Sequence, residues 1–188
     1  MRKVVVSEYV SLDGVMEDPG GAEGFKHGGW SFQYFNQEVA QFKFDELFAS
    51  DALLLGRVTY QGFAKAWPAM KDEQGFSDRM NNLPKYVAST TLETLDWNNS
   101  HLLKGDVAEE VSKLKQQEGQ NILVAGSRNF VQTLIQHNLV DEYTLIVHPI
   151  VLGSGKRLFG DSPDKLPLKL INSKTYDSGV VILTYQPA

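Results

Sequence analysis

The sequence of 188 residues contains no cysteine. That absence excludes disulfide bonds, thiolate catalysis and zinc sites with cysteine ligands, and it leaves the redox compartment undetermined. The four histidines, His27, His101, His137 and His148, are widely spaced and form no metal-binding pattern. We therefore expect a structural or surface role for each histidine, and we predict no metal site.

Long apolar segments are also missing. No window approaches the roughly 20 apolar residues that a membrane helix needs. Glu8 interrupts the apolar N-terminal run after three valines, which argues against a signal peptide. A cytoplasmic protein without a membrane partner is therefore expected.

Basic residues are in deficit, because 18 Lys and Arg stand against 23 Asp and Glu, for a formal net charge of -5. A protein that binds the phosphate backbone of nucleic acids needs clustered Lys and Arg. The one dense basic spot, Lys156-Arg157, is too short for that purpose. We expect a small-molecule ligand and no nucleic acid.

What the sequence does contain is an alternation of strand and helix patterns. Short apolar runs typical of buried strands alternate with stretches of helical spacing, and the chain ends on a predicted hairpin around Asp177-Ser178-Gly179. The expected strands are 4–10, 52–55, 85–88, 122–125 and 143–151, and the expected helices are 32–47, 58–66, 107–118 and 127–138. This order predicts one α/β domain over residues 1–188, a three-layer α/β/α sandwich. Its central sheet would be mixed, mainly parallel, with an antiparallel C-terminal hairpin.

Two segments combine a buried strand, a glycine turn and a helix start. They are 54–60, Leu-Leu-Gly-Arg-Val-Thr-Tyr, and 123–130, Leu-Val-Ala-Gly-Ser-Arg-Asn-Phe. Each turn offers backbone N–H groups and the positive end of a helix dipole to a phosphate. Thr59 and Ser127 can donate hydroxyl hydrogen bonds, and Arg57 adds a positive charge. Glycines occur at such turns throughout α/β proteins, so each motif alone is nonspecific.

Three further groups of residues allow two interpretations. Ser89 and Thr90 could bind a ribose phosphate, or they could simply turn the chain. Tyr60 and Trp67 could line a pocket for a planar substrate, or they could belong to the core. The glycine-rich segment 153–157 could contact a substrate phosphate or form a turn.

A resemblance to a known family adds to these observations. Ser11-Leu12-Asp13-Gly14, then 55–60, Val124-Ala125-Gly126-Ser127, Asp141-Glu142 and 148–159 follow one another in this order. Together they resemble the C-terminal reductase domain of the bifunctional riboflavin deaminase-reductase, which is itself similar to dihydrofolate reductase. The likeness runs from about residue 3 to residue 185. The deaminase half is missing, and Ala125-Gly126 stands where dihydrofolate reductase has a glycine pair.

The resemblance implies a dihydrofolate reductase-like fold, bound NADPH and a homodimer. It implies that the cofactor is held by Gly14, Gly56, Arg57, Thr59, Ser89, Thr90, Ala125, Gly126 and Ser127. Asp13 is the candidate catalytic residue. Ser11, Tyr60 and Trp67 are the candidate substrate-binding residues. No residue of the first helix forms a convincing motif for the carboxylate that dihydrofolate reductase carries there.

The resemblance implies an NADPH-dependent reductase that transfers hydride to a small polar, pterin- or aminopyrimidine-like substrate. Asp13 would supply or relay the proton, with a pKa raised by partial burial. Two alternatives stay open. The chain could be a non-catalytic NADP-binding module that kept the fold without turnover, and Asp13 could be only a turn residue before Gly14.

Overall fold

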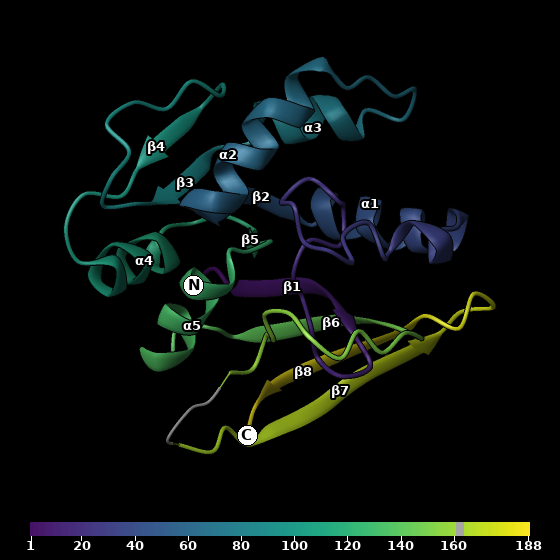
Figure 1. Cartoon of the computed structure of the whole chain (residues 1–188). Helices are drawn as coiled ribbons and strands as arrows, with labels where there is room; N and C mark the ends of the chain where they lie inside the picture. Colours follow the sequence, from purple (N-terminus) through teal and green to yellow (C-terminus); the bar gives the residue numbers. More distant parts are fainter. Residues whose placement is uncertain (161–163) are drawn as a thin grey trace.

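The protein, described by a computed structural model for residues 1–160 and 164–188, is built on one eight-stranded sheet (Figure 1). The strand order is β4-β3-β2-β5-β1-β6-β8-β7. The six strands from β4 to β6 are parallel, whereas β8 and β7 continue the sheet in antiparallel fashion. The strands are β1 (Val4–Ser11), β2 (Ser50–Gly56), β3 (Lys85–Ala88), β4 (Ser100–Leu102), β5 (Asn121–Val124), β6 (Glu142–His148), β7 (Leu168–Thr175) and β8 (Val181–Pro187).

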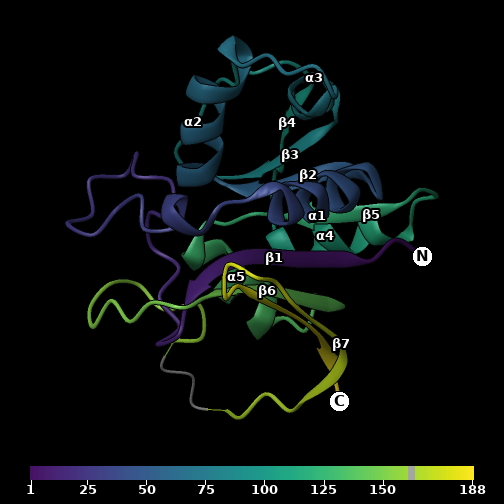
Figure 2. The same ribbon diagram turned by 90° about the vertical axis from the view of Figure 1, so that its right-hand side faces the viewer.

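Helices cover both faces of the sheet (Figures 1 and 2). On one face the core includes residues of α1, α2 and α3 packed on Leu53 and Leu55 of β2. On the other face, residues of α4 and α5 pack on Val4 and Val6 of β1. The helices are α1 (Gln37–Phe48), α2 (Arg57–Ala66), α3 (Phe76–Asn82), α4 (Val107–Gln116) and α5 (Arg128–Gln136), with 3-10 turns at Phe32–Tyr34 and Trp67–Ala69. The predicted three-layer α/β/α sandwich with a C-terminal hairpin is confirmed.

The first helix begins later than its spacing predicts. Asn36 caps α1 by accepting a hydrogen bond from the Val39 amide at 2.9 Å, so the helix proper starts at Gln37. Phe32 and Phe35, which fall at the start of the expected helix 32–47, are 65% and 59% exposed. The predicted periodicity over 32–47 therefore merged an exposed loop with a helix.

Two short elements were not predicted. Helix α3 has seven residues, and its first turn is held by the Asp72 carboxylate, which accepts from the amides of Phe76 and Ser77. Strand β4 has three residues at the edge of the sheet, none of them fully buried. Neither is long enough to display a period. In the described part of the chain, no helix combines the length and apolarity needed to cross a membrane.

Candidate functional site

The two predicted glycine turns meet at the carboxyl ends of β2 and β5. These strands are neighbours, and the Gly56 amide donates to the Gly126 carbonyl at 3.0 Å. A Cβ on Gly56 would lie 2.9 Å from the Ser127 nitrogen, and a Cβ on Gly126 would lie 2.6 Å from Thr59 Oγ1. Only glycine therefore lets the turns approach so closely. We call Gly56, Thr59, Gly126 and Ser127 together the glycine cradle.

The helices that start in the glycine cradle are uncapped in the described structure. At the N-caps of α2 and α5, which are Gly56 and Ser127, no described side chain accepts a hydrogen bond from the helix. By contrast, Asn36 caps α1 and Asp106 caps α4. Two uncapped N-termini that converge on one place offer unpaired N–H donors and two positive dipole ends. This is the arrangement that binds phosphate groups.

The remaining predicted cofactor residues surround the cradle unevenly. Arg57 is exposed, and its Nη1 donates to Gln61 Oε1 at 3.1 Å. Ser89 and Thr90 follow β3, whose Ala88 pairs with Gly56, so they lie beside the β2 turn. The Ser89 hydroxyl already accepts from the amides of Thr91 and Leu92, which is the chain-turning role that the sequence left open. Ala125 packs partly buried against the core.

Asp13 is tied into a network at the first loop. Its carboxylate accepts from Ser11 Oγ at 2.6 Å, from the Leu152 amide at 3.1 Å and from the Gly153 amide at 2.8 Å. The Arg157 guanidinium lies 3.7 Å away. The hydrogen bond from Ser11 has the largest effect, and together with the two amide hydrogen bonds it lowers the pKa of Asp13 to about 2. The expectation that burial raises this pKa is wrong, because hydrogen bonds to the charged form outweigh burial.

The same network shows what the segment 153–157 does. Arg157 Nε donates to the Asp13 carbonyl at 2.9 Å, and Val15 forms an antiparallel bridge with Arg157. Gly14 sits in this loop with a φ of +80°, which favours glycine. The segment thus turns the chain and anchors the first loop. The turn interpretation is supported over a phosphate contact.

Tyr60 and Trp67 face the core. Tyr60 is 3% exposed, and its hydroxyl accepts a hydrogen bond from the Trp97 amide at 3.0 Å. Trp67 packs against Phe63 and Phe76 in the same cluster. This placement favours the core interpretation, and no observation supports the predicted substrate contact. Ser11, also buried, orients Asp13.

A buried carboxyl in β1 is a feature that the sequence analysis missed. Glu8 is 7% exposed, and its Oε1 has no hydrogen-bond partner among the residues that the structure describes. Burial raises the pKa of Glu8 to about 8; Lys43 lowers it, and Glu46 and Glu23 raise it further. Lys43 itself donates to Ser7 Oγ at 3.1 Å and pairs with Glu46. The signal in the sequence is an acidic residue inside a run of buried valines, which served above only to argue against a signal peptide.

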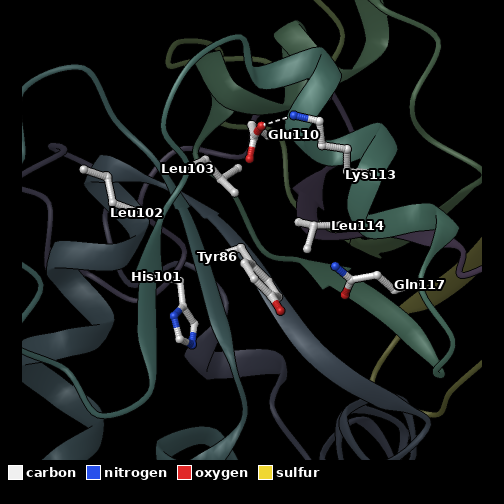
Figure 3. Close-up of a pocket in the computed structure, with 8 residues that line it drawn as sticks. All are labelled: Tyr86, His101, Leu102, Leu103, Glu110, Lys113, Leu114 and Gln117. Atoms are coloured by element: carbon white, nitrogen blue, oxygen red, sulfur yellow. Dashed lines mark hydrogen bonds and ion pairs between the residues drawn. The ribbon is translucent and has the colours of Figure 1, made fainter.

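One hollow in the surface lies away from these residues. It is formed by the edge of the sheet and by α4, with the Glu110–Lys113 ion pair of 2.7 Å along its rim (Figure 3). None of the predicted site residues lines it. The glycine cradle is therefore the better candidate site.

Comparison with protein families shows the family of this chain. The family model of the RibD C-terminal domain matches residues 2–182. The chain belongs to this family. Two proteins similar to this chain are uncharacterized proteins of Bacillus subtilis. YyaP is 32% identical over 187 residues, with 98% of this chain and 94% of YyaP covered. YwjB is 27% identical over 186 residues, with 95% of each chain covered.

Solved structures share the fold of this RibD C-terminal domain. A putative riboflavin biosynthesis protein from Shewanella sp. PV-4 is 25% identical with a TM-score of 0.75, and the match covers 99% of each chain. A deaminase/reductase from Thermotoga maritima has a TM-score of 0.67 at 15% identity, and the match covers all of this chain and 57% of that one. A dihydrofolate reductase from Enterococcus faecalis, complexed with NADP(H), has a TM-score of 0.62 at 13% identity. The match covers 98% of this chain and 96% of that one. The fold is dihydrofolate reductase-like.

Proposed function

We propose that this chain is a cytoplasmic NADPH-dependent reductase that transfers hydride to a small polar acceptor of the pterin or aminopyrimidine kind. The observation that carries the proposal is the glycine cradle, where two uncapped helix N-termini meet at the ends of adjacent parallel strands. Ligands of open α/β sheets bind at such strand ends. Membership of the RibD C-terminal domain family supports the reductase chemistry.

The residues present fit an NADP-type cofactor. Amides of the first turns of α2 and α5, with the hydroxyls of Thr59 and Ser127, would hold the pyrophosphate. Arg57 is exposed beside the cradle and would take the 2′-phosphate, since guanidinium matches phosphate geometry. The exposed Thr90 and neighbouring Ser89 would lie on the same side. When bound, the cofactor supplies the hydride, while the protein orients it and excludes water.

A second candidate function is a non-catalytic NADP-binding module. The observation that favours it is the low pKa of Asp13, because a carboxyl that is ionised near neutral pH has no proton to donate. Both functions require nucleotide binding at the cradle. They differ only in turnover.

One experiment in two steps distinguishes the reductase from the binding module. NADPH is titrated into the protein, with binding followed by fluorescence and calorimetry, and NADPH absorbance is then followed with pterin and aminopyrimidine acceptors. Binding with acceptor-dependent oxidation supports the reductase. Binding without oxidation of any acceptor supports the binding module. Absence of NADPH binding at micromolar protein would reject both.

A further inference from the structure

We propose that Glu8 responds to the charge of the bound nicotinamide, holding a proton beside the neutral reduced ring and releasing it beside the cationic oxidised ring. The inference rests on the proposed function, because it needs an NADP-type cofactor in the glycine cradle. It assigns a binding role to a residue outside the predicted site.

The strand register places Glu8 next to the cradle. Strand β1 pairs with β5 in parallel up to Val6 and Val124. Two residues further on, the same register brings Glu8 level with Gly126, where β5 has ended and its turn begins. On its other side β1 stays paired with β6 as far as Ser11. Glu8 is thus held within the sheet, level with the point where β5 ends.

The two sides of the cradle differ in character. Toward β3 lie Ser89 and Thr90, the second of them exposed. Toward β1 lies Glu8, which is buried. A dinucleotide with its phosphates in the cradle extends one ring system toward each side. The water-excluded side suits the reacting ring, because excluding water from the site of hydride transfer prevents side reactions. We therefore place the nicotinamide on the side of Glu8.

In the described part of the chain, no basic side chain forms an ion pair with Glu8. Side chains alternate along a strand, so Glu8 shares its face with Val6 and Val10, both buried and apolar. Within residues 1–160 and 164–188, Oε1 has no hydrogen-bond partner. Lys43 of α1 bonds instead to Ser7, on the opposite face, and to Glu46. A buried polar atom without a partner is costly, and a ligand that supplies one is favoured.

The charged groups around Glu8 set its proton affinity. Lys43 and Glu46 act from α1 and Glu23 acts from the first loop, while burial is the largest effect and raises the pKa of Glu8 to about 8. An opposite charge within about 4–6 Å lowers a carboxyl pKa by about 1–3 units. Binding of NADP⁺ near neutral pH should therefore break the Glu8 O–H bond and pass the proton to water. NADPH, whose ring is neutral, should leave that bond intact.

The experiment measures the dissociation constants of NADP⁺ and NADPH from about pH 6 to about pH 9, which spans the Glu8 pKa of about 8. The ratio of the two constants cancels the 2′-phosphate, which titrates near pH 6 in both nucleotides. In the wild type, the dissociation constant of NADP⁺ relative to that of NADPH should fall by about ten-fold as the pH rises across this range. Calorimetry in buffers of different ionisation enthalpy should show proton release with NADP⁺ alone.

Glutamine is neutral and nearly isosteric with glutamate. In the Glu8→Gln variant, the ratio of the NADP⁺ and NADPH dissociation constants should therefore not change with pH. The control Glu118→Gln makes the same charge change at an exposed position beyond α4, and it should keep the wild-type dependence. A flat ratio in the wild type, or a Glu8→Gln variant that keeps the wild-type dependence, would overturn the inference while leaving nucleotide binding in place. Failure of the wild type to bind either nucleotide would instead reject the proposed function and, with it, the role of Glu8.

Discussion

The Asp13 carboxylate accepts a hydrogen bond of 2.8 Å from the amide of Gly153, which lies 140 residues further along the chain. This bond joins the Ser11–Gly14 loop to the turn after β6, and it belongs to the set of contacts that lowers the pKa of Asp13 to about 2. Two motifs that the sequence presents as separate form one structural unit.

Replacing Asp13 with Asn should destabilise the fold at neutral pH by about 1–2 kcal/mol, since hydrogen bonds to an ionised acceptor are lost. The folded-state pKa is depressed, so the contribution of the carboxylate is present above the ordinary pKa of 3.8 and disappears as pH falls toward about 2. Urea unfolding of both proteins should therefore show curves that differ at neutral pH and converge in that acidic window. Asp177→Asn, in an exposed hairpin turn, is the control. A difference that persists unchanged at about pH 2 would contradict the assignment.

Gly56→Ala tests the close approach of the two turns. Gly56 has a φ of -75°, so alanine is unstrained there, but its Cβ would lie 2.8 Å from Phe130 Cβ. We expect a loss of about 1–3 kcal/mol from overpacking and at least about ten-fold weaker NADPH binding, because the turns are forced apart.

Alanine substitutions at two other glycines separate the effect of a steric clash from the effect of backbone conformation. Gly75 has a φ of +84° and no atom within 4 Å of the position that a Cβ would take, so Gly75→Ala adds backbone strain without a clash. Gly62, inside α2, has open space and no positive φ, so Gly62→Ala should stabilise by about 0.5–1 kcal/mol. Both variants should bind NADPH like the wild type. If the Gly56→Ala variant bound NADPH as tightly as the wild type, the cradle would not hold the phosphates.

Arg57→Ala should weaken NADPH binding by about ten-fold and NADH binding by less than about two-fold, since the guanidinium is proposed to meet the 2′-phosphate alone. Lys65→Ala removes one positive charge from the other end of α2 and serves as the control. Titrations of the three proteins with both nucleotides provide the comparison. Equal losses for NADPH and NADH in Arg57→Ala would show that Arg57 acts through general charge or through the fold.

The fold could be predicted because its information is local. The parallel strands are short runs of apolar residues, and the capping pair Asp106 and Glu109 marks α4, where the Asp106 carboxylate accepts from the Glu109 amide at 3.0 Å. The hairpin turn contains Gly179 at a φ of +83°, as its sequence suggests. Elements of three to seven residues, β4 and α3, are fixed by contacts with distant segments and were missed.

The site could be predicted only in part, for the same reason. Glycine turns are visible in the sequence, but their contact depends on the pairing of β2 with β5. The proton affinities of Asp13 and Glu8 depend on amides and apolar side chains brought in by the tertiary fold. The sequence therefore favoured Asp13 as the acid, whereas the structure lowers its pKa and raises that of Glu8. Sequence position indicates where a carboxyl lies but not what surrounds it.

The homodimer suggested by the family resemblance stays a prediction. The edge strand β7 exposes apolar side chains, with Leu170 at 49% and Ile171 at 47%, and exposed apolar surface favours association. Light scattering at micromolar concentration should give twice the chain mass of 21.0 kDa. A mass of one chain that stays constant as concentration rises would exclude the dimer.

The last prediction concerns the pH dependence of stability, which tests Glu8 without any ligand. Its pKa is raised on folding from 4.5 to about 8, so its contribution to stability is fully present below the unfolded value and is lost as pH rises through the folded one. Between these two values the unfolding free energy should carry a term that falls by about 1.4 kcal/mol per pH unit, one proton being bound by the native state and not by the unfolded chain. Glu8→Gln lacks this proton, so its unfolding free energy should fall less steeply over the same window and exceed that of the wild type at the alkaline end. Urea denaturation of both proteins at a series of pH values measures the two slopes, with Glu118→Gln expected to follow the wild type. Parallel curves for wild type and Glu8→Gln would mean that Glu8 is ionised in the folded protein, and that a solvated or paired carboxylate occupies this position in β1.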